Sequence, residues 1–391
     1  MFPRISIRFW LLFSVTISLI ALLSFNKAQT LPLNSVYSNI PKSFLEQQKP
    51  EINSSRPLAS EMTRNVQRIA APSRTASLRG KRSEAHWAWL TTVDISAAQG
   101  NVGIGVLDLN TGESWFHNGT QQFPMQSVFK LPVGIVVLKL VDEGKVSLGQ
   151  LVTISRQEFA PGWSPILKEI PGNSGQFTVR DLLERSVGSS DNTAADALVR
   201  LVGGTEKVTD ILHQMNIQGI RVDRLEQQLQ PDCVGMTNFR PELVDEQKYA
   251  QAVEKIPDAV KRAALERYLT DPRDTATPEA TVNLLAKLQA RQLLSENSTA
   301  LLIKIMTDSP TGQQRLKAGL PKDWSIAHKT GSGPEVLGVG TATNDVGIIS
   351  SPTGKQVAIS VFISGSKAPM EMREKVMAEI ASTVVKESND E

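Results

Sequence analysis

Cysteine is almost absent from this sequence, and its scarcity excludes one class of proteins. The 391 residues include a single cysteine, Cys233. No disulfide can therefore form within the chain, which rules out a disulfide-stabilised secreted scaffold. The four histidines occur without an HExxH or a CxxC motif, so we expect neither a metal ion nor a cofactor.

A surplus of charge of either sign is also missing. The chain has 42 basic and 40 acidic residues, which gives a net charge of +2. Because nucleic acids are bound by concentrated basic surfaces, this balance argues against a nucleic-acid partner. Hydrophobic residues at 40% and charged residues at 21% are typical of an ordinary globular chain.

The N-terminal residues have the pattern of an export signal. Arg4 and Arg8 precede an uncharged apolar run at 9–25, and Ala28 is a small residue at which a signal peptidase could cut. We predict a signal peptide at 1–28 and a secreted, periplasmic protein. An uncleaved membrane anchor is the alternative, because the apolar run is long for a signal peptide.

Residues 29–83 have the composition of a flexible linker. Prolines are spread among serine, asparagine and glutamine without sustained apolar periodicity. The basic residues from Arg64 to Arg82 have no acidic residue between them, so weak membrane association through this linker or the N-terminal segment is one interpretation. A solvated linker is the simpler one. The folded domain then occupies residues 84–391.

Strands are predicted at both ends of this domain and helices between them. The expected strands are 102–108, 113–116, 325–328, 342–350 and 356–364. The expected helices include 179–187, 193–202, one that begins at 205, and 278–289. The pattern predicts an α/β (α+β) fold in which a five-stranded antiparallel sheet of N- and C-terminal strands encloses a large helical block.

Ser127 and Lys130 form a Ser-x-x-Lys motif at the start of an apolar segment. The stretch 131–140 predicts a buried helix, and residues three apart share a helix face. The Lys130 ammonium is then placed beside the Ser127 hydroxyl, which is one way to activate a serine nucleophile. A second copy of the motif, 364–367, lies at the end of a predicted strand and lacks this geometry.

Two further motifs each have a structural and a functional interpretation. The Ser-Asp-Asn segment 190–192 precedes a helix and would cap it, or Ser190 would pass a proton to a leaving nitrogen while Asn192 holds an acyl side chain. The Lys-Thr-Gly-Ser segment 329–332 follows a strand. It is either a turn, or a track whose cation and hydroxyl bind a substrate carboxylate and whose backbone N–H completes an oxyanion hole.

In this order along the chain, the three motifs form the signature of the penicillin-recognising serine enzymes. Over about 84–385 the chain resembles the class A β-lactamases. Gln126, Asp196 and the segment 342–347 are similar to the PER/VEB-like extended-spectrum subgroup, and the segment 224–229 resembles the Ω loop of the family.

The resemblance implies a role for each site residue. The catalytic set is Ser127, Lys130, Ser190 and Glu226, in which Ser127 is the nucleophile and Glu226 activates the water that frees it. The substrate-binding set is Asn192, Lys329, Thr330, Ser332 and Trp163, with Trp163 at the mouth of the site. The backbone N–H groups of Ser127 and Ser332 would stabilise the oxyanion. Whether Lys130 or Glu226 is the base of the first step stays open.

Some positions depart from the family pattern. Most of the family has asparagine where Asp196 stands, and Gln230 replaces an asparagine that shares the hydrolytic water. No lysine or arginine occurs from 330 to 354, so the arginine that often supports the substrate carboxylate is missing. The residues left for that task are Lys329, Thr330, Ser190 and Ser332. Arg224 and Asp274, in contrast, match the ion pair of the family's Ω loop.

The larger departure is an insertion of about 35 residues, at about 231–270, which a surface loop tolerates well. It contains two helix-like pieces, 241–255 and 258–269. The insertion is either a lid over the site or a surface helical hairpin, and we favour the hairpin. Its packing residues would be Val260, Ala264, Leu265 and Leu269.

The resulting expectation is a monomeric enzyme that hydrolyses the β-lactam amide bond of penicillins and cephalosporins through a serine acyl-enzyme and so gives antibiotic resistance. The alternatives are a penicillin-binding D-Ala-D-Ala peptidase and a penicilloyl sensor domain that does not hydrolyse its adduct. Both would share Ser127 and Lys130 but would lack a deacylating carboxylate, so Glu226 argues against them.

Overall fold

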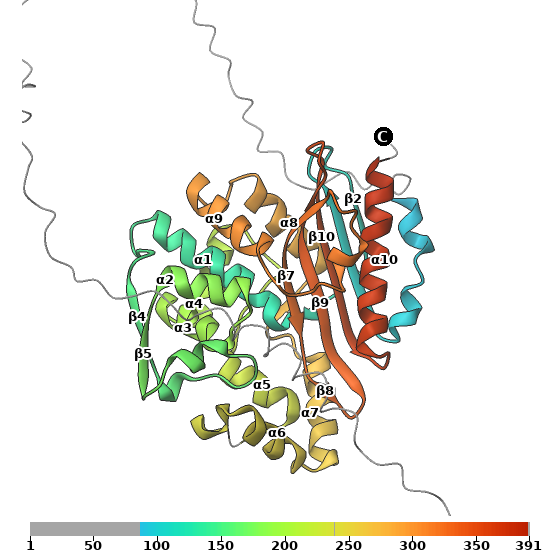
Figure 1. The fold of residues 1–391 in the computed structure, drawn as a ribbon. Helices are drawn as coiled ribbons and strands as arrows, with labels where there is room; N and C mark the ends of the chain where they lie inside the picture. The colour runs from blue at the N-terminus through green and yellow to red at the C-terminus, as the bar shows by residue number, and fades with distance from the viewer. Residues whose placement is uncertain (1–86, 238, 390–391) are drawn as a thin grey trace, which may run out of the picture. The chain divides into compact units, whose positions relative to one another are not determined.

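The N- and C-terminal strands of the described residues, 87–237 and 239–389, meet in one antiparallel sheet in the computed structural model (Figure 1). The order is β2-β1-β10-β9-β7, and β8 pairs with β9 outside this path. The strands are β1 (Asn101–Asp108), β2 (Ser114–His117), β7 (Ser325–Ser332), β8 (Glu335–Val336), β9 (Val339–Ser350) and β10 (Gln356–Ser366). The predicted fold class and its five strands are confirmed, and the short β8 is an addition.

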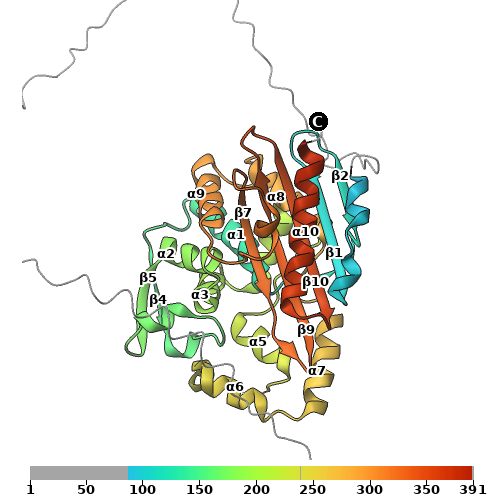
Figure 2. The same ribbon diagram turned by 45° about the vertical axis from the view of Figure 1, so that its right-hand side comes forward.

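A helical block covers one face of the sheet, and one long helix with the short 3-10 helices Ala88–Thr92 and Ile95–Ala98 beside it covers the other (Figures 1 and 2). The helices of the block are α1 (Lys130–Asp142), α2 (Val179–Leu183), α3 (Asn192–Val202), α4 (Thr205–Gln214), α8 (Pro278–Gln289) and α9 (Glu296–Thr307). The long helix on the opposite face is α10 (Met370–Asn389). Two small sheets, β3 (Phe123–Pro124) with β6 (Thr275–Ala276) and β4 (Leu151–Ser155) with β5 (Ser174–Thr178), complete the strands.

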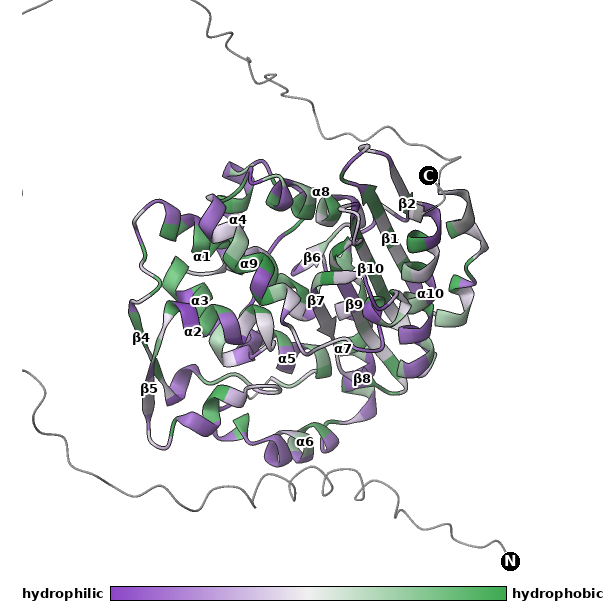
Figure 3. Ribbon diagram, turned by 45° about the horizontal axis from the view of Figure 1, so that its top comes forward, coloured by the Kyte–Doolittle hydropathy of each residue, from purple (hydrophilic) through white to green (hydrophobic). Residues whose placement is uncertain are grey.

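The alternation of side chains along β10 divides the hydrophobic core into two parts. Successive residues of a strand point to opposite faces of a sheet. Val357 and Ile359 pack in the cluster that contains α10, whereas Ala358 and Phe362 pack in the cluster of the helical block. Hydrophobic residues accordingly follow the sheet and the helices that cover it (Figure 3). Both cores depend on the same strand.

Local capping explains where the helices near the predicted motifs begin and end. The Thr178 hydroxyl accepts from the Asp181 N–H while Asp181 accepts from Thr178, which is a complete capping box for α2. The helix expected over 179–187 ends at Leu183 and continues as a π-helical turn at Glu184–Gly188. Such turns recur at functional sites, and this one leads directly into the Ser-Asp-Asn segment.

The two helix-like pieces expected in the insertion are present as α6 (Glu246–Glu254) and α7 (Asp258–Thr270), and a further helix, α5 (Glu226–Val234), precedes them. All three lie at the lower edge of the view in Figure 1. α6 buries no residue and is largely hydrophilic (Figure 3), whereas α7 buries Ala264, Leu265 and Tyr268. Of the expected packing residues, Val260 stays 41% exposed. α7 therefore carries the packing of the insertion.

Three findings concern membranes, metals and the N-terminus. Within the described ranges, no helix is both long and apolar enough to span a bilayer. The same residues contain no group of three His, Cys, Asp or Glu side chains that could hold a metal ion. The predicted signal peptide at 1–28 and linker at 29–83 lie outside the described residues.

Candidate active site

Ser127 lies in a 3-10 turn, Gln126–Phe129, which leads into the buried helix α1. Strand β7 passes directly over this turn. A Cβ atom added at Gly331 would lie 2.5 Å from the Met125 carbonyl oxygen and 3.1 Å from the Val128 nitrogen. Only glycine allows the backbone of the Lys-Thr-Gly strand to come this close to the serine, which explains the third residue of that motif.

Lys130 is the buried centre of the polar cluster. Its Nζ donates to Ser127 Oγ at 2.9 Å, to Asn192 Oδ1 at 2.6 Å and to the Ser190 carbonyl oxygen at 2.8 Å. It also lies 2.9 Å from Glu226 Oε1, in an ion pair whose two side chains are fully buried. The predicted helical proximity of Ser127 and Lys130 is thus present, and the amine is within reach of the serine proton.

Glu226 faces the same serine from the first turn of α5. Its Oε1 lies 3.4 Å from Ser127 Oγ, and its Oε2 accepts a hydrogen bond of 2.8 Å from Gln230 Nε2. Asp196 accepts from the backbone N–H groups of Glu226 and Gln227 at 2.7 and 3.0 Å. The residue that departs from the family pattern, Asp196, therefore fixes the start of α5 and with it the carboxylate of Glu226.

Asp196 is itself in an unfavourable place for a charge. Burial, and in second place the negative charge of Glu226, raise the pKa of Asp196 from 3.8 to about 7. The two backbone N–H groups that it accepts from oppose this shift.

Ser190 and Lys329 meet on the other side of the nucleophile. Ser190 has a φ of 65°, which is unusual for a residue with a side chain and marks a strained loop. Lys329 Nζ donates to Ser190 Oγ at 2.9 Å and to the Thr330 carbonyl oxygen at 2.8 Å. Burial, and then the positive charge of Lys130, lower the pKa of Lys329 well below its usual range. Lys329 therefore holds its proton less tightly than an exposed lysine does, and its amine lies within hydrogen-bond distance of the Ser190 hydroxyl.

The neighbouring strand β9 carries no arginine, as expected, but a buried arginine from another segment lies against this part of the site. Arg315 precedes β7 in the chain and is buried behind it. Its Nη2 donates to Ser332 Oγ at 2.6 Å, and its Nη1 donates to the carbonyl oxygens of Gly331 and Asn344 at 3.1 and 2.9 Å. This cation comes from the segment before β7 and not from the strand that pairs with it, so no motif of the sequence indicates it.

The remaining predicted binding residues lie around this cluster. Thr330 Oγ1 donates to Thr311 Oγ1 at 2.9 Å. Asn192 Nδ2 donates to the Pro161 carbonyl oxygen at 2.8 Å. Trp163 is 64% exposed, and its Nε1 donates to the Ser189 carbonyl oxygen at 2.8 Å, so it lies beside the serine loop with its ring open to solvent.

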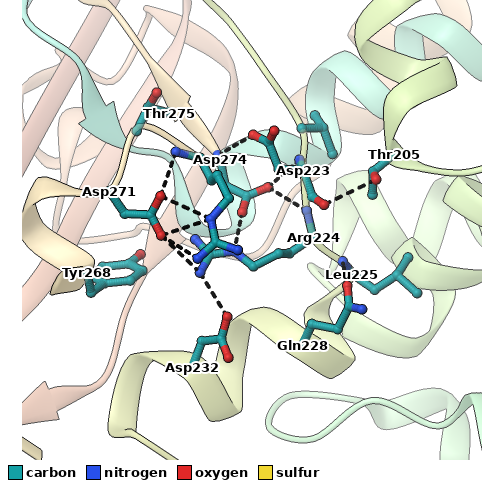
Figure 4. Close-up of polar contacts among 12 residues, drawn as sticks. Thr205, Asp223, Arg224, Leu225, Gln228, Asp232, Tyr268, Asp271, Asp274 and Thr275 are labelled. Atoms are coloured by element: carbon teal, nitrogen blue, oxygen red, sulfur yellow. Dashed lines mark hydrogen bonds and ion pairs between the residues drawn. The ribbon is translucent and has the colours of Figure 1, made fainter. Parts of the chain in front are cut away.

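A buried arginine joins the two ends of the segment that carries Glu226 (Figure 4). Arg224 Nε lies 2.6 Å from Asp274 Oδ2, and its Nη1 lies 3.1 Å from Asp232 and 3.4 Å from Asp271. Asp274 Oδ1 also accepts from the backbone N–H groups of Asp223 and Arg224. The ion pair expected between Arg224 and Asp274 is therefore present.

Comparisons with known proteins agree with this geometry. The family described as the β-lactamase enzyme family matches residues 88–388. β-Lactamase VEB-1 of Pseudomonas aeruginosa is 33% identical over 290 residues, which cover 73% of this chain and 85% of that protein. The extended-spectrum β-lactamase PER-1 of the same organism is 33% identical over 283 residues, which cover 72% and 80%.

Solved structures show the same similarity. The crystal structure of a β-lactamase from Chitinophaga pinensis has a TM-score of 0.63 at 32% identity and covers 78% of this chain and 99% of its own. That of the TLA-1 extended-spectrum β-lactamase has a TM-score of 0.64 at 28% identity and covers 79% and 99%.

Proposed function

This chain belongs to the class A β-lactamases, which are hydrolases, and we propose that it hydrolyses penicillins and cephalosporins through an acyl-enzyme formed on Ser127. Its biological effect would be resistance to these antibiotics. The observation that carries the proposal is the buried carboxylate of Glu226, 3.4 Å from Ser127 Oγ and paired with Lys130.

Acylation begins with attack of Ser127 Oγ on the carbonyl carbon of the lactam ring. The serine proton passes to Lys130 or to Glu226, both of which lie within reach of the hydroxyl. The backbone N–H groups of Ser127 and Ser332 stabilise the oxyanion. When the C–N bond breaks, Ser190 gives its proton to the ring nitrogen, and Lys329 can return a proton to Ser190 through their 2.9 Å contact.

Deacylation needs a base on the water side of the ester. Glu226 takes a proton from a water molecule, the hydroxide attacks the ester carbonyl, and the C–O bond to Ser127 breaks with return of the proton. The Gln230 amide, bonded to Glu226 Oε2, is placed to share this water. A peptidase or a penicilloyl sensor has no use for such a carboxylate, so its position supports the hydrolase.

Substrate binding follows from the polar groups along β7. Lys329 and Thr330 would bind the carboxylate of the β-lactam, and Arg315 adds its positive charge behind Ser332. Asn192 would hold the amide of the acyl side chain, and the exposed Trp163 would contact it at the mouth of the site.

The proposal is tested with a chromogenic cephalosporin in large excess, followed by mass spectrometry of the protein. The parent should turn over continuously, whereas Glu226→Ala should release one equivalent and keep an adduct on Ser127, with kcat lower by about 10²–10⁴-fold. Glu206→Ala, the same change in the exposed first turn of α4, is the matched control and should behave as the parent.

Two outcomes would contradict the proposal. A persistent adduct on the parent would indicate a peptidase or a sensor, and sustained turnover by Glu226→Ala would remove the role of Glu226. Export to the periplasm, a monomeric state and weak membrane association stay predictions.

A further inference from the structure

We infer that Tyr268, on helix α7 of the insertion, is a positioning residue for deacylation that holds Glu226 in place through Gln126 and Gln230. The inference rests on the proposed function, because it assigns the insertion a part in the same hydrolysis. It makes α7 a support of the active site rather than a lid or an independent surface hairpin.

A continuous series of hydrogen bonds connects the insertion to the carboxylate. Gln126 Nε2 donates to Tyr268 Oη at 2.5 Å. Gln230 Nε2 donates to Gln126 Oε1 at 3.2 Å and to Glu226 Oε2 at 2.8 Å. Tyr268 is 5% exposed and Gln126 is 1% exposed, so water competes poorly for these bonds.

The chemistry of the groups gives this series a single direction. An ionised carboxylate only accepts hydrogen bonds, so Gln230 must turn its NH₂ group toward Glu226. That NH₂ group has two donors, and the second one requires the carbonyl oxygen of Gln126. Gln126 must then turn its own NH₂ group the other way, toward an acceptor. Tyr268 Oη supplies the nearer acceptor at 2.5 Å, and Cys233 Sγ is a weaker second acceptor at 3.5 Å, so both favour the same orientation of the Gln126 amide.

The Tyr268 oxygen accepts through a lone pair, which leaves its own proton for a second partner. A hydrogen bond from Tyr268 is among the causes that oppose the raised pKa of Cys233. Burial nevertheless raises the pKa of Cys233 to about 12, so the thiol stays neutral and serves as a weak acceptor. Burial likewise raises the pKa of Tyr268 well above its usual range, so the phenol keeps its proton.

The packing of α7 fixes the position of the phenol. The Tyr268 ring packs with Leu229 and Cys233 of α5. One turn earlier, Leu265 packs with Val234 of α5 and Val336 of β8. α7 therefore joins the helix that carries Glu226 to the end of the sheet that follows the Lys-Thr-Gly strand.

Gln126 has a backbone that needs such support. Its φ is 45°, in the left-handed region that residues with a side chain rarely adopt, and it directly precedes Ser127. If the side chain of Gln126 loses the acceptor on Tyr268, its NH₂ group keeps only the weak acceptor Cys233 Sγ at 3.5 Å. The Gln126 amide is then held less firmly, and so is the Gln230 amide that bonds its oxygen.

The test is Tyr268→Phe, which keeps the ring and removes the acceptor, with Tyr249→Phe as the matched control. Tyr249 lies in α6 of the same insertion and packs edge-on against Phe239. Acylation and deacylation rates are measured by rapid quench and mass spectrometry of the full protein. In Tyr268→Phe, deacylation should slow by about tenfold while acylation changes little. Acylation alone sets kcat/KM, so this ratio should stay as in the parent. The slower deacylation should therefore lower kcat and KM by the same factor. Tyr249→Phe should match the parent.

A second variant tests the series of hydrogen bonds at Gln126, the residue that Tyr268 contacts. Gln126→Met keeps the length of the side chain and removes both polar ends. It should slow deacylation by a similar factor, and the double variant with Tyr268→Phe should lose little more than either single variant, because both break the same series.

The outcomes separate this inference from the proposed function. A parent that never releases its adduct contradicts the proposed hydrolysis. A parent that turns over, with Tyr268→Phe deacylating at the parental rate, contradicts only the role of Tyr268. Equal losses in acylation and deacylation, or additive losses in the double variant, would reduce Tyr268 to a packing residue and would also overturn the inference.

Discussion

Asp196 combines two properties that usually exclude each other in a carboxylate. It is fully buried, and it accepts backbone hydrogen bonds at the start of α5 as an ionised group would. Its folded-state pKa of about 7 lies above the value of 3.8 for a free aspartate. The folded protein therefore binds the Asp196 proton more tightly than the unfolded chain does.

This difference predicts how stability depends on pH. Proton binding at Asp196 stabilises the folded state fully below about pH 4, and this stabilisation is lost as the pH rises through about 7. The Tm of the parent should therefore fall between pH 5 and pH 8. Asp196→Asn cannot titrate and should flatten this slope, although it loses one acceptor. Thermal unfolding from pH 5 to pH 9 measures both slopes.

Asp181→Asn is the matched control for that measurement. The hydrogen bond from Thr178 lowers the pKa of Asp181, so its contribution is present at neutral pH and is lost only toward acid. Its removal should leave the slope between pH 5 and pH 8 as in the parent. Equal slopes in the parent and in Asp196→Asn would show that other groups cause the dependence.

Site residues can be predicted from the sequence where they belong to a short sequence motif. Ser127 and Lys130 share a helix face, but Ser190 and Lys329 stand in motifs that are ambiguous alone. It is the order of the three motifs, and the family resemblance that this order carries, that predicts their roles. Arg315 and Tyr268 stand in no motif. Their side chains reach the site only because β7 and α7 pack there, and that packing is a property of the tertiary fold.

At the scale of elements, the segment from Arg224 to Asp274 is closed by a buried ion pair. The Arg224 guanidinium bridges three aspartates, and its nearest contact is with Asp274, whose pKa is raised by burial. The same pair holds both ends of the chain from which α5, α6 and α7 emerge. Removal of this ion pair should lower the free energy of unfolding.

Arg224→Ala should destabilise the protein by about 3–5 kcal/mol, because it leaves Asp274 buried without its cation. Asp274→Ala should have a similar effect, and the double variant should lose less than the two single losses added together. Urea unfolding measures the four free energies. Arg180→Ala, which breaks an exposed pair with Glu184, should cost about 0–1 kcal/mol. Additive losses for Arg224 and Asp274 would contradict the coupling.

The sequence predicts helices and strands well where hydrophobic periodicity and capping residues agree. It predicts them poorly where contacts with distant parts of the chain determine the local structure. The strands of the main sheet and the helices capped by Thr178 and Thr277 begin close to the expected residues. The π-helical turn at Glu184–Gly188 leaves no periodic signal. The surface-hairpin interpretation predicts packing by Ala264, Leu265 and Leu269, which do pack, but it does not indicate the contact of Tyr268 with Gln126, because a tyrosine at one position does not reveal its partner.

At the scale of the molecule, the sheet is shared by two cores that serve different purposes. The core of the helical block contains α1 and lies next to the polar cluster. The core under α10 lies on the opposite face of the sheet and contains none of the proposed site residues. Its contribution should be to the stability of the whole domain and not to the geometry of catalysis.

Ile380→Ala, in α10, should lower the free energy of unfolding by about 2–5 kcal/mol, because the side chain is fully buried. The kcat measured well below the melting temperature should stay within about twofold of the parent. Because both cores share β10, loss of activity and loss of tryptophan fluorescence should follow one transition on heating. Two separate transitions, or a low kcat in the folded variant, would contradict this division.

The pairing of β1 with β10 also sets an order of events during translation. Asn101 of β1 and Ser364 of β10, which are 263 positions apart along the chain (364 − 101), are paired in the finished sheet. At about 5–20 residues per second, a ribosome needs about 10–50 s to add the residues that separate the two strands. For that time the nascent chain carries β1 with an open edge. The sheet can close only after β10 has been synthesised, so until then β1 lacks the partner that covers this edge.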